Sequence, residues 1–165
     1  MKTAIIPGSF DPMTVGHRDL VKRARRLFDT VVVAIMVNPD KKYIFDFSER
    51  RRIAELTLDG IDGVEIVTSE GMLADLASGI GAVAIVKGVR NTRDFVYEQE
   101  MAIFNHSLAP DCETVYLPSY GKMTDISSTA VRRALEENTD TEGLLDSRAA
   151  EYIKRIYADK RSKNI

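Results

Sequence analysis

The sequence has one cysteine, two histidines and no excess of either charge, and each shortage excludes a class of proteins. The cysteine, Cys112, cannot form an internal disulfide, which favours a reduced, cytoplasmic location. No run approaches the roughly 20 apolar residues of a membrane-spanning helix, so we expect no membrane partner. The formal net charge of −2 lacks the basic excess of nucleic-acid binders, so no nucleic-acid partner is expected either.

The histidines are His17 and His106, and neither stands near Cys112 in the sequence. We therefore predict no histidine–cysteine metal cluster and no protein-built metal site. A nucleophile elbow and a pair of glycosidase-type carboxylates are also missing. Asp11 has no second carboxylate beside it, and its place between Phe10 and Pro12 favours a role in fixing a turn.

What the chain does contain is an alternation of short β-branched runs with longer amphipathic segments. Two of the runs, at 31–35 and 83–86, are continuously apolar, as in parallel strands that are buried on both faces. Strands separated by helices predict right-handed crossovers and a parallel sheet. The predicted strands are Thr3–Ile6, Thr30–Val37, Val64–Val67, Ala82–Val86 and Thr114–Leu117.

We therefore predict an α/β fold, a single Rossmann-like, doubly wound domain over residues 1–165 with a five-stranded parallel sheet. The apolar spacing from Leu20 to Phe28 predicts the first helix. Ser48 is the expected N-cap of the second, and Gly60 its expected stop. A helical C-terminal segment is expected over about 146–160.

Nearly all the polar, glycine-rich segments follow a predicted strand. The carboxyl ends of parallel strands meet at one edge of a sheet, so these segments should converge there. Together they supply cations, hydroxyl groups and backbone N–H groups. A phosphate-rich ligand is therefore predicted at this edge.

The most specific segment is Gly8-Ser9-Phe10-Asp11-Pro12, followed by Thr14-x-Gly16-His17. We expect Gly8 to let the chain turn off the first strand, and Ser9 to offer its hydroxyl and N–H to an oxygen. His17 falls in the first turn of the next helix, where N–H groups and the helix dipole favour an anion. A histidine there can donate a hydrogen bond to a phosphate with or without a charge.

Two further segments carry cations and hydroxyl groups after the fourth and fifth strands. The first is Lys87-Gly88-Val89-Arg90, with Asp94-Phe95-x-Tyr97-Glu98 behind it. The second is Ile126-Ser127-Ser128-Thr129 with Arg132, where a serine caps a helix and leaves an anion site at its N-terminus.

These three segments resemble those of the nucleotidyltransferase superfamily, and the Thr-x-Gly-His form at 14–17 resembles the bacterial phosphopantetheine adenylyltransferases. The resemblance extends from Pro7 to about Arg132. It implies the reaction of ATP with 4′-phosphopantetheine to give 3′-dephospho-coenzyme A and pyrophosphate, with Mg²⁺ arriving on ATP. It also implies a cytoplasmic homohexamer that coenzyme A inhibits by feedback.

The resemblance assigns roles to individual residues. It gives catalytic roles to Ser9, His17 and Lys41, with Lys42 as the neighbouring candidate for the lysine. It assigns the acceptor phosphopantetheine to Ser9, Lys41, Leu73 and Lys87. Lys87 stands where many relatives have arginine, so it keeps the charge but loses the planar fork.

The residues that the resemblance assigns to ATP are Ser9, Phe10, His17, Gly88, Val89, Arg90, Glu98, Met123, Thr124, Asp125, Ile126, Ser127, Ser128 and Thr129. The preceding stretch at 120–125 departs from the aromatic-rich form that the resemblance would lead one to expect.

A phosphate monoester is already anionic at neutral pH, so it needs no general base to attack phosphorus. We therefore expect direct, in-line attack of the acceptor phosphate on the α-phosphorus of ATP, without a covalent intermediate.

Two alternative functions stay open. One is a related nucleotidyltransferase that uses nicotinamide mononucleotide or an alcohol phosphate such as glycerol 3-phosphate. The other is a non-catalytic nucleotide-sensing domain.

Overall fold

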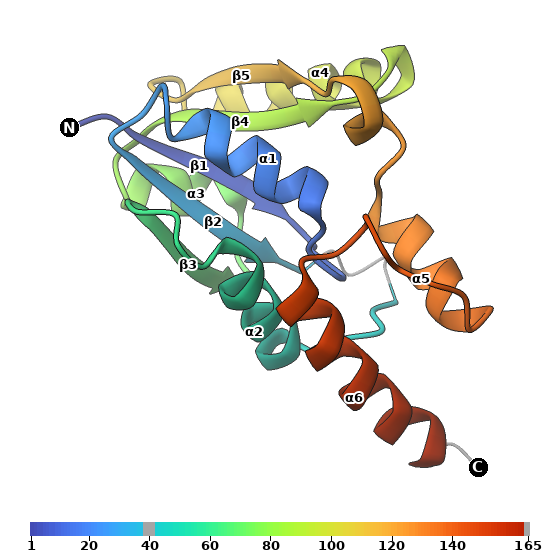
Figure 1. Cartoon of the computed structure of the whole chain (residues 1–165). Helices are drawn as coiled ribbons and strands as arrows, with labels where there is room; N and C mark the ends of the chain where they lie inside the picture. The colour runs from blue at the N-terminus through green and yellow to red at the C-terminus, as the bar shows by residue number, and fades with distance from the viewer. Residues whose placement is uncertain (38–41, 164–165) are drawn as a thin grey trace.

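The computed structural model describes residues 1–37 and 42–163, which alternate strands and helices in an α/β arrangement (Figure 1). The strands are β1 (Thr3–Gly8), β2 (Thr30–Met36), β3 (Val64–Ser69), β4 (Ala82–Val89) and β5 (Glu113–Pro118). The helices are α1 (Val15–Ala24), α2 (Phe47–Leu58), α3 (Leu73–Gly79), α4 (Thr92–Leu108), the 3₁₀ turn η1 (Gly121–Thr124), α5 (Ser128–Glu136) and α6 (Ser147–Lys163).

The five strands form one sheet in the order β3-β2-β1-β4-β5, and every neighbouring pair is parallel. The chain builds outward from β1 to β3 and then crosses back to place β4 on the other side of β1. The strand order therefore reverses between β1 and β4, where a doubly wound sheet opens a crevice for ligands. The predicted fold class and five-stranded parallel sheet are confirmed.

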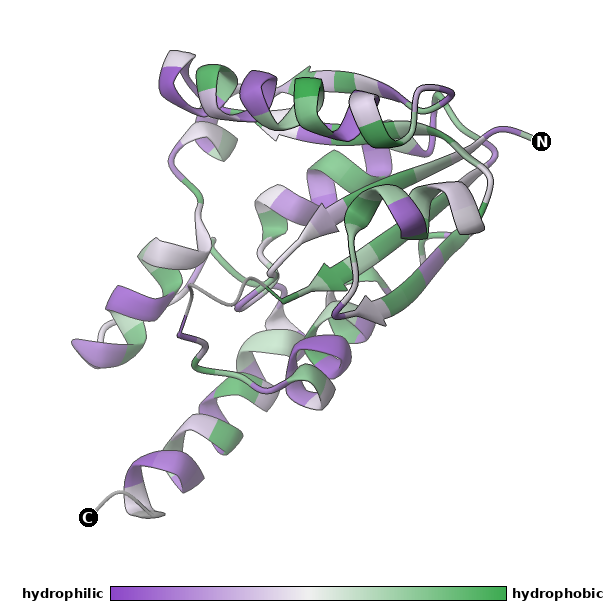
Figure 2. Ribbon diagram, turned by 180° about the vertical axis from the view of Figure 1, so that it is seen from behind, coloured by the Kyte–Doolittle hydropathy of each residue, from purple (hydrophilic) through white to green (hydrophobic). Residues whose placement is uncertain are grey.

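Alternate residues of the strands enter two separate cores, one on each face of the sheet. Ala4, Ile6 and Val33 belong to the core that α1, α2 and α6 cover. Ile5 and Val32 point the other way, into a smaller core with α3 and the buried Cys112. Burial on both faces explains the continuously apolar run at 31–35 in β2, and much of the sheet is drawn in green in Figure 2.

Several element boundaries differ from the predictions. β1 continues to Gly8 and β4 to Val89, because Gly8 pairs in register with Ile35 and Val89 with Pro118. These residues were expected in loops. The helix α1 ends at Ala24 instead of reaching Phe28, and the extra apolar residue Leu27 is exposed.

The second helix begins earlier than expected. Asp46, rather than Ser48, is its N-cap, since the Asp46 carboxylate accepts the Glu49 N–H while the Glu49 carboxylate accepts the Asp46 N–H. Ser48 instead donates its hydroxyl to Asp46. Gly60 follows the end of α2 with a φ of 77°, as a helix-stopping glycine should.

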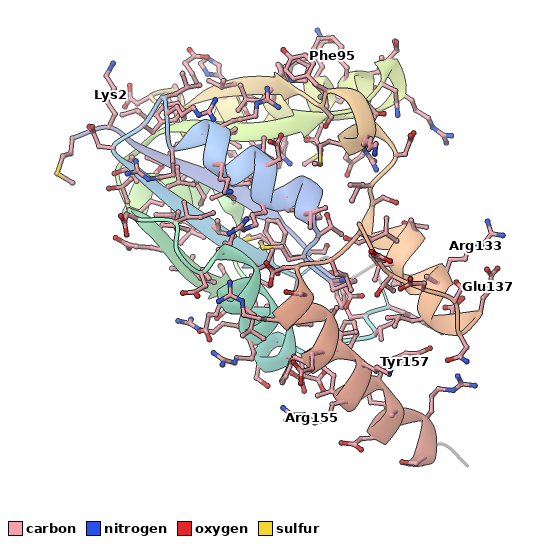
Figure 3. All side chains as sticks on the ribbon, in the orientation of Figure 1. Lys2, Phe95, Arg133, Glu137, Arg155 and Tyr157 are labelled. Atoms are coloured by element: carbon pink, nitrogen blue, oxygen red, sulfur yellow. The ribbon has the colours of Figure 1, made fainter. Side chains whose placement is uncertain are left out.

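The C-terminal helix α6 projects from the sheet beside α5, at the end of the molecule opposite the N-terminus (Figure 1). It packs against α2 through two ion pairs, Lys160 with Glu49 and Arg148 with Asp59. Figure 3 labels Arg155 and Tyr157 on this helix, far from Phe95 on α4. No helix in the described part of the chain is both long and apolar enough to cross a membrane.

Candidate active site

A cavity of about 1050 Å³ lies at the carboxyl edge of the sheet, at the point between β1 and β4 where strand order reverses. Residues from the ends of both strands line it, together with the first turns of α1 and α4 and the segment that leads into α5. Its size suits a nucleotide-sized ligand.

The first wall of the cavity begins at Ser9 and Phe10. Phe10 adopts the left-handed region with φ at 47°, so the chain turns there, and not at Gly8 as predicted. Gly8 is required for a different reason. A Cβ atom at that position would lie 2.8 Å from Cζ of the Phe10 ring, which folds back over the strand end.

Asp11 joins this wall to a distant segment. Its buried carboxylate accepts the backbone N–H groups of Ile44 and Phe45, at 3.0 and 2.9 Å. The interpretation of Asp11 as a turn-fixing residue is therefore too narrow, because the two amides lie more than 30 residues away in the chain.

His17 is held by a reciprocal hydrogen-bond pair with Thr14, the N-cap of α1. The Thr14 N–H donates to Nδ1 of His17 at 3.0 Å, and the His17 N–H donates to the Thr14 hydroxyl oxygen at 3.4 Å. Since Nδ1 accepts, the neutral ring carries its proton on Nε2. The Phe10 ring packs edge-on against the imidazole with centroids 5.1 Å apart. The Thr-x-Gly-His spacing is thus that of a capping box, with Thr14 at the N-cap and His17 at the N3 position of the helix.

The pKa of His17 is lowered from 6.5 to about 4. Burial of the imidazole is the larger cause, and the positive charge of Arg90 is the smaller one. The imidazole is therefore neutral near pH 7. It offers Nε2–H as a fixed donor and brings no charge of its own.

The opposite wall carries cations that are paired with carboxylates. Nζ of Lys87, at the end of β4, lies 2.9 Å from Oε2 of Glu98 on α4, and about a fifth of each side chain is exposed (19% and 18%). Despite this distance, Glu98 Oε2 receives no hydrogen bond of good geometry among the described residues. The pair is a close contact of opposite charges.

Arg90 is held more tightly by Asp94. Nε of Arg90 donates to Asp94 at 2.8 Å, Nη2 donates at 3.3 Å, and the Arg90 backbone N–H donates to the same carboxylate at 3.3 Å. Asp94 itself lies in the first turn of α4, where Asn91 caps the helix by accepting the Asp94 N–H. One carboxylate thus fixes both the backbone and the guanidinium of Arg90.

The segment before α5 closes the cavity from a third side. Ser127 is the N-cap of α5 and accepts the Ala130 N–H at 3.1 Å. Ser128 donates its hydroxyl to the Pro12 carbonyl, and Arg132 donates to the Asp11 carbonyl. These two bonds tie α5 to the loop that follows β1, although the segments are more than 110 residues apart in the chain.

Most of the predicted site residues line this cavity: Ser9, Phe10, His17, Lys87, Gly88, Arg90, Glu98, Met123, Ile126, Ser127, Ser128 and Thr129. Four do not. Leu73 begins α3 and packs against the smaller core, Val89 lines a neighbouring shallow pocket, and Thr124 and Asp125 lie in or after η1. Lys41 lies outside the described residues, whereas its neighbour Lys42 lines the cavity.

Sequence reasoning left out the lining residue Arg93, and it named Tyr97 in a motif without giving it a role in the site. Both lie on α4, four residues apart, which is the spacing of one helix face. That spacing could have marked them, had α4 been placed precisely.

Among residues 1–37 and 42–163, no three His, Cys, Asp or Glu side chains gather as a metal site. The carboxylates of the cavity already have positive or N–H partners: Asp11 binds two amides, Asp94 binds Arg90, and Glu98 faces Lys87. A divalent ion would therefore fit best as part of a nucleotide complex, with phosphate oxygens and water as its ligands.

Comparison with known proteins agrees with this geometry. The cytidylyltransferase-like family model matches residues 5–134, and the chain therefore belongs to that class of nucleotidyltransferases. A phosphopantetheine adenylyltransferase of Limosilactobacillus reuteri is 38% identical over 155 residues, which cover 94% of this chain and 90% of that protein. One of Clostridium beijerinckii is 41% identical over 145 residues, covering 88% and 91%. The chain is thus a member of the phosphopantetheine adenylyltransferase family, as its motifs predicted.

A solved structure shares the fold at much lower identity. Plasmodium falciparum nicotinic acid mononucleotide adenylyltransferase, complexed with NaAD, superimposes with a TM-score of 0.69 and 16% identity, covering 96% of this chain and 98% of that one. At that identity the likeness concerns the fold alone.

Proposed function

We propose that this chain transfers the adenylyl group of ATP to 4′-phosphopantetheine, forming 3′-dephospho-coenzyme A and pyrophosphate. The supporting observation is that one cavity combines a neutral His17, with Nε2–H as its donor, and the cations of Lys87 and Arg90. Such a set can offset the charge of two phosphate chains without a protein nucleophile.

The chemical step is a direct displacement. An oxygen of the acceptor phosphate forms a bond to the α-phosphorus of ATP as the bond to the α–β bridging oxygen breaks, and pyrophosphate leaves with that electron pair. His17 donates from Nε2 to an α-phosphate oxygen, where charge grows in the transition state. Ser9 orients the reacting phosphates, and Lys41 bridges them.

The remaining residues hold the two substrates. Lys87 binds the acceptor phosphate, while Arg90 and the N-terminus of α5 at Ser127–Thr129 hold the β- and γ-phosphates. Phe10, Gly88, Val89, Glu98 and the residues from Met123 to Ile126 complete the proposed ATP site. Leu73 is proposed to contact the pantetheine arm.

Mg²⁺ enters as part of the MgATP substrate. It supplies positive charge at the phosphates, while the cations and donors of the chain orient them.

The working form of the protein is proposed to be a cytoplasmic homohexamer that coenzyme A inhibits. Exposed apolar side chains on α4, namely Phe95, Ile103 and Phe104, support assembly through that helix, and Figure 3 labels Phe95 at the outer edge of the molecule. The mass in solution, measured by light scattering, tests this part. A monomer at micromolar concentration would contradict it.

The deciding experiment measures pyrophosphate release from MgATP with three acceptors in parallel: 4′-phosphopantetheine, nicotinamide mononucleotide and glycerol 3-phosphate. Release with phosphopantetheine alone, together with 3′-dephospho-coenzyme A as product, is the expected result. Release only with another acceptor would keep the chemistry and replace the substrate. No release with any of them, together with stoichiometric ATP binding, would favour a nucleotide-sensing domain.

A further inference from the structure

Arg50 is a buried charged residue behind the first wall of the cavity. It lies in the first turns of α2, is 2% exposed, and does not line the cavity. Its Nη1 donates to the carbonyl oxygens of Ser9 at 2.8 Å and Met36 at 3.2 Å. These carbonyls stand at the carboxyl ends of β1 and β2, so one guanidinium connects α2 to both strand ends.

The guanidinium also lies over two aromatic rings. Its central carbon lies 4.2 Å from the centroid of Tyr43 and 4.7 Å from that of Phe47. In addition, Nε is buried without a hydrogen-bond partner among the described residues. Removing a guanidinium from water costs free energy, which backbone carbonyls and aromatic faces offset only in part. An apolar side chain could fill this place, so the charge calls for a functional reason.

The reason follows from the geometry of the peptide between Ser9 and Phe10. This bond is trans, because the cis peptide in the described chain is Asp11–Pro12. In a trans peptide the carbonyl and the N–H point in opposite directions. The Ser9 carbonyl points at Arg50, so the Phe10 N–H points away from Arg50, and both Ser9 and Phe10 line the cavity.

The Phe10 N–H donates to no backbone or side-chain acceptor among the described residues. Phe10 also holds the left-handed φ of 47°, a conformation that a phenylalanine adopts only when its surroundings impose it. A guanidinium bonded to the Ser9 carbonyl both fixes this peptide and polarises its N–H.

We propose that Arg50 is a positioning residue for adenylyl transfer: it binds the Ser9 carbonyl from behind the wall and thereby presents the Phe10 N–H to the phosphates of the bound nucleotide. The inference rests on the proposed function for its substrate. The contacts that carry it are those of Arg50, Ser9 and Phe10 themselves. Arg50 touches neither substrate and acts through the peptide.

The test compares Arg50→Met and Arg50→Lys with two controls on the same helix. Arg51→Met removes a neighbouring exposed arginine that pairs with Glu55. Ile53→Val shortens a fully buried core residue that makes no contact with the Ser9 carbonyl, and it lowers stability alone. For each variant, kcat, KM and the melting temperature are measured, and the ¹H–¹⁵N signal of Phe10 is followed as ATP is added.

Arg50→Met is expected to lower kcat/KM by about 100-fold, mostly through kcat, since a small misplacement of a donor has an effect of that order. The ATP-induced shift of the Phe10 amide signal should disappear. Arg50→Lys, which keeps the charge and N–H donors but loses the planar guanidinium, should recover part of both effects. Arg51→Met and Ile53→Val should stay within about twofold of the wild type per folded molecule.

A normal kcat in folded Arg50→Met, or a loss that only follows the melting temperature as in Ile53→Val, would overturn the proposal. If Arg50→Met does not fold, Arg50→Lys and Phe47→Leu, which removes one of the two rings, decide by the same two readouts. If the wild type releases no pyrophosphate with phosphopantetheine, the proposed function fails. The Phe10 signal and the ATP affinity of the variants then still decide the role of Arg50.

Discussion

The wall of the cavity formed by β1 and α1 differs from the wall formed by β4 and α4 in how its polar groups are held. On the first wall Thr14 is 1% exposed, and three hydrogen-bond contacts join it to His17. On the second wall Lys87 and Arg90 are held by carboxylates, and 19% and 37% of their side chains are exposed. Hydrogen bonds to backbone fix the first wall, whereas ion pairs near solvent hold the second.

The difference indicates a division of labour. A donor that must meet charge developing in a transition state gains from being fixed beforehand, because no reorganisation is then needed. A cation that must receive and release a polyanion gains from a partner that can be exchanged, since exposed ion pairs are weak. We therefore expect substitutions on the first wall to change kcat or the fold, and substitutions on the second to change binding.

The largest expected effect comes from His17→Ala on the first wall. Loss of the Nε2–H donor should lower kcat by about 100- to 1000-fold, as for other donors that act in the transition state. The ATP dissociation constant should change by less than about threefold, because the ring adds little ground-state charge. Pyrophosphate release and calorimetric titration of ATP give the two values.

His106→Ala is the matched control. His106 is exposed in the last turn of α4 and should leave both constants unchanged. Turnover of His17→Ala near the wild-type rate would remove His17 from the mechanism and with it the contrast between the walls.

The second effect is on stability and depends on pH. The pKa of His17 falls from 6.5 in the unfolded chain to about 4 in the fold, so the unfolded chain takes up the proton first as pH falls. The free energy of unfolding should therefore decrease as pH is lowered from 6.5 to 4, by at most about 3 kcal/mol. Part of the imidazole faces the cavity, and solvent screening makes the observed value smaller.

Urea denaturation of the wild type and of His17→Asn across this pH range measures the effect. The difference between the two proteins isolates His17 from carboxylates that titrate lower, such as Asp46, whose pKa the Glu49 N–H lowers. A wild-type curve parallel to that of His17→Asn would show that the imidazole is not held neutral.

The third effect compares two glycines. In Gly8→Ala the new Cβ meets the Phe10 ring at 2.8 Å, so the ring that packs on His17 must move. We expect a loss of about 1–3 kcal/mol in the free energy of unfolding and a lower kcat. Gly79→Ala, at the end of α3 with nothing within 4 Å of its Cβ, should be neutral or slightly stabilising. Equal melting temperatures for the two variants would contradict this account of Gly8.

The sequence predicted the place of the cavity better than the way its first wall is built. The strand order, the cavity edge and the cations after β4 follow from apolar periodicity and from spacing along the chain. Gly8 was correctly marked as special but for the wrong reason, because the turn falls on Phe10 and the glycine makes room for its ring. No periodicity shows which ring folds over which backbone.

Arg50 shows the other limit of sequence reasoning. It is the first of three consecutive arginines, and the other two, Arg51 and Arg52, are exposed. The sequence gives no sign that Arg50 differs from them. Only its burial distinguishes Arg50 from Arg51 and Arg52. In that buried place it contacts Ser9 and Met36, which lie 41 and 14 residues away in the chain. Contacts of that range depend on how α2 packs across the ends of β1 and β2.

The smallest expected effect is that of Glu98→Gln on the second wall. Removing this carboxylate takes a negative charge from beside Lys87 while leaving a side chain of the same shape, so pyrophosphate should bind more tightly. A partly exposed pair of this kind is worth about 1 kcal/mol, or about fivefold in the dissociation constant.

Glu137→Gln is the control, because its partner Arg133 lies on the outer face of α5 (Figure 3) and neither residue lines the cavity. Calorimetric titration with pyrophosphate compares the two. Weaker binding of pyrophosphate to Glu98→Gln would mean that the carboxylate holds Lys87 in place for the ligand, as Thr14 holds His17. The two walls would then differ only in how exposed their side chains are.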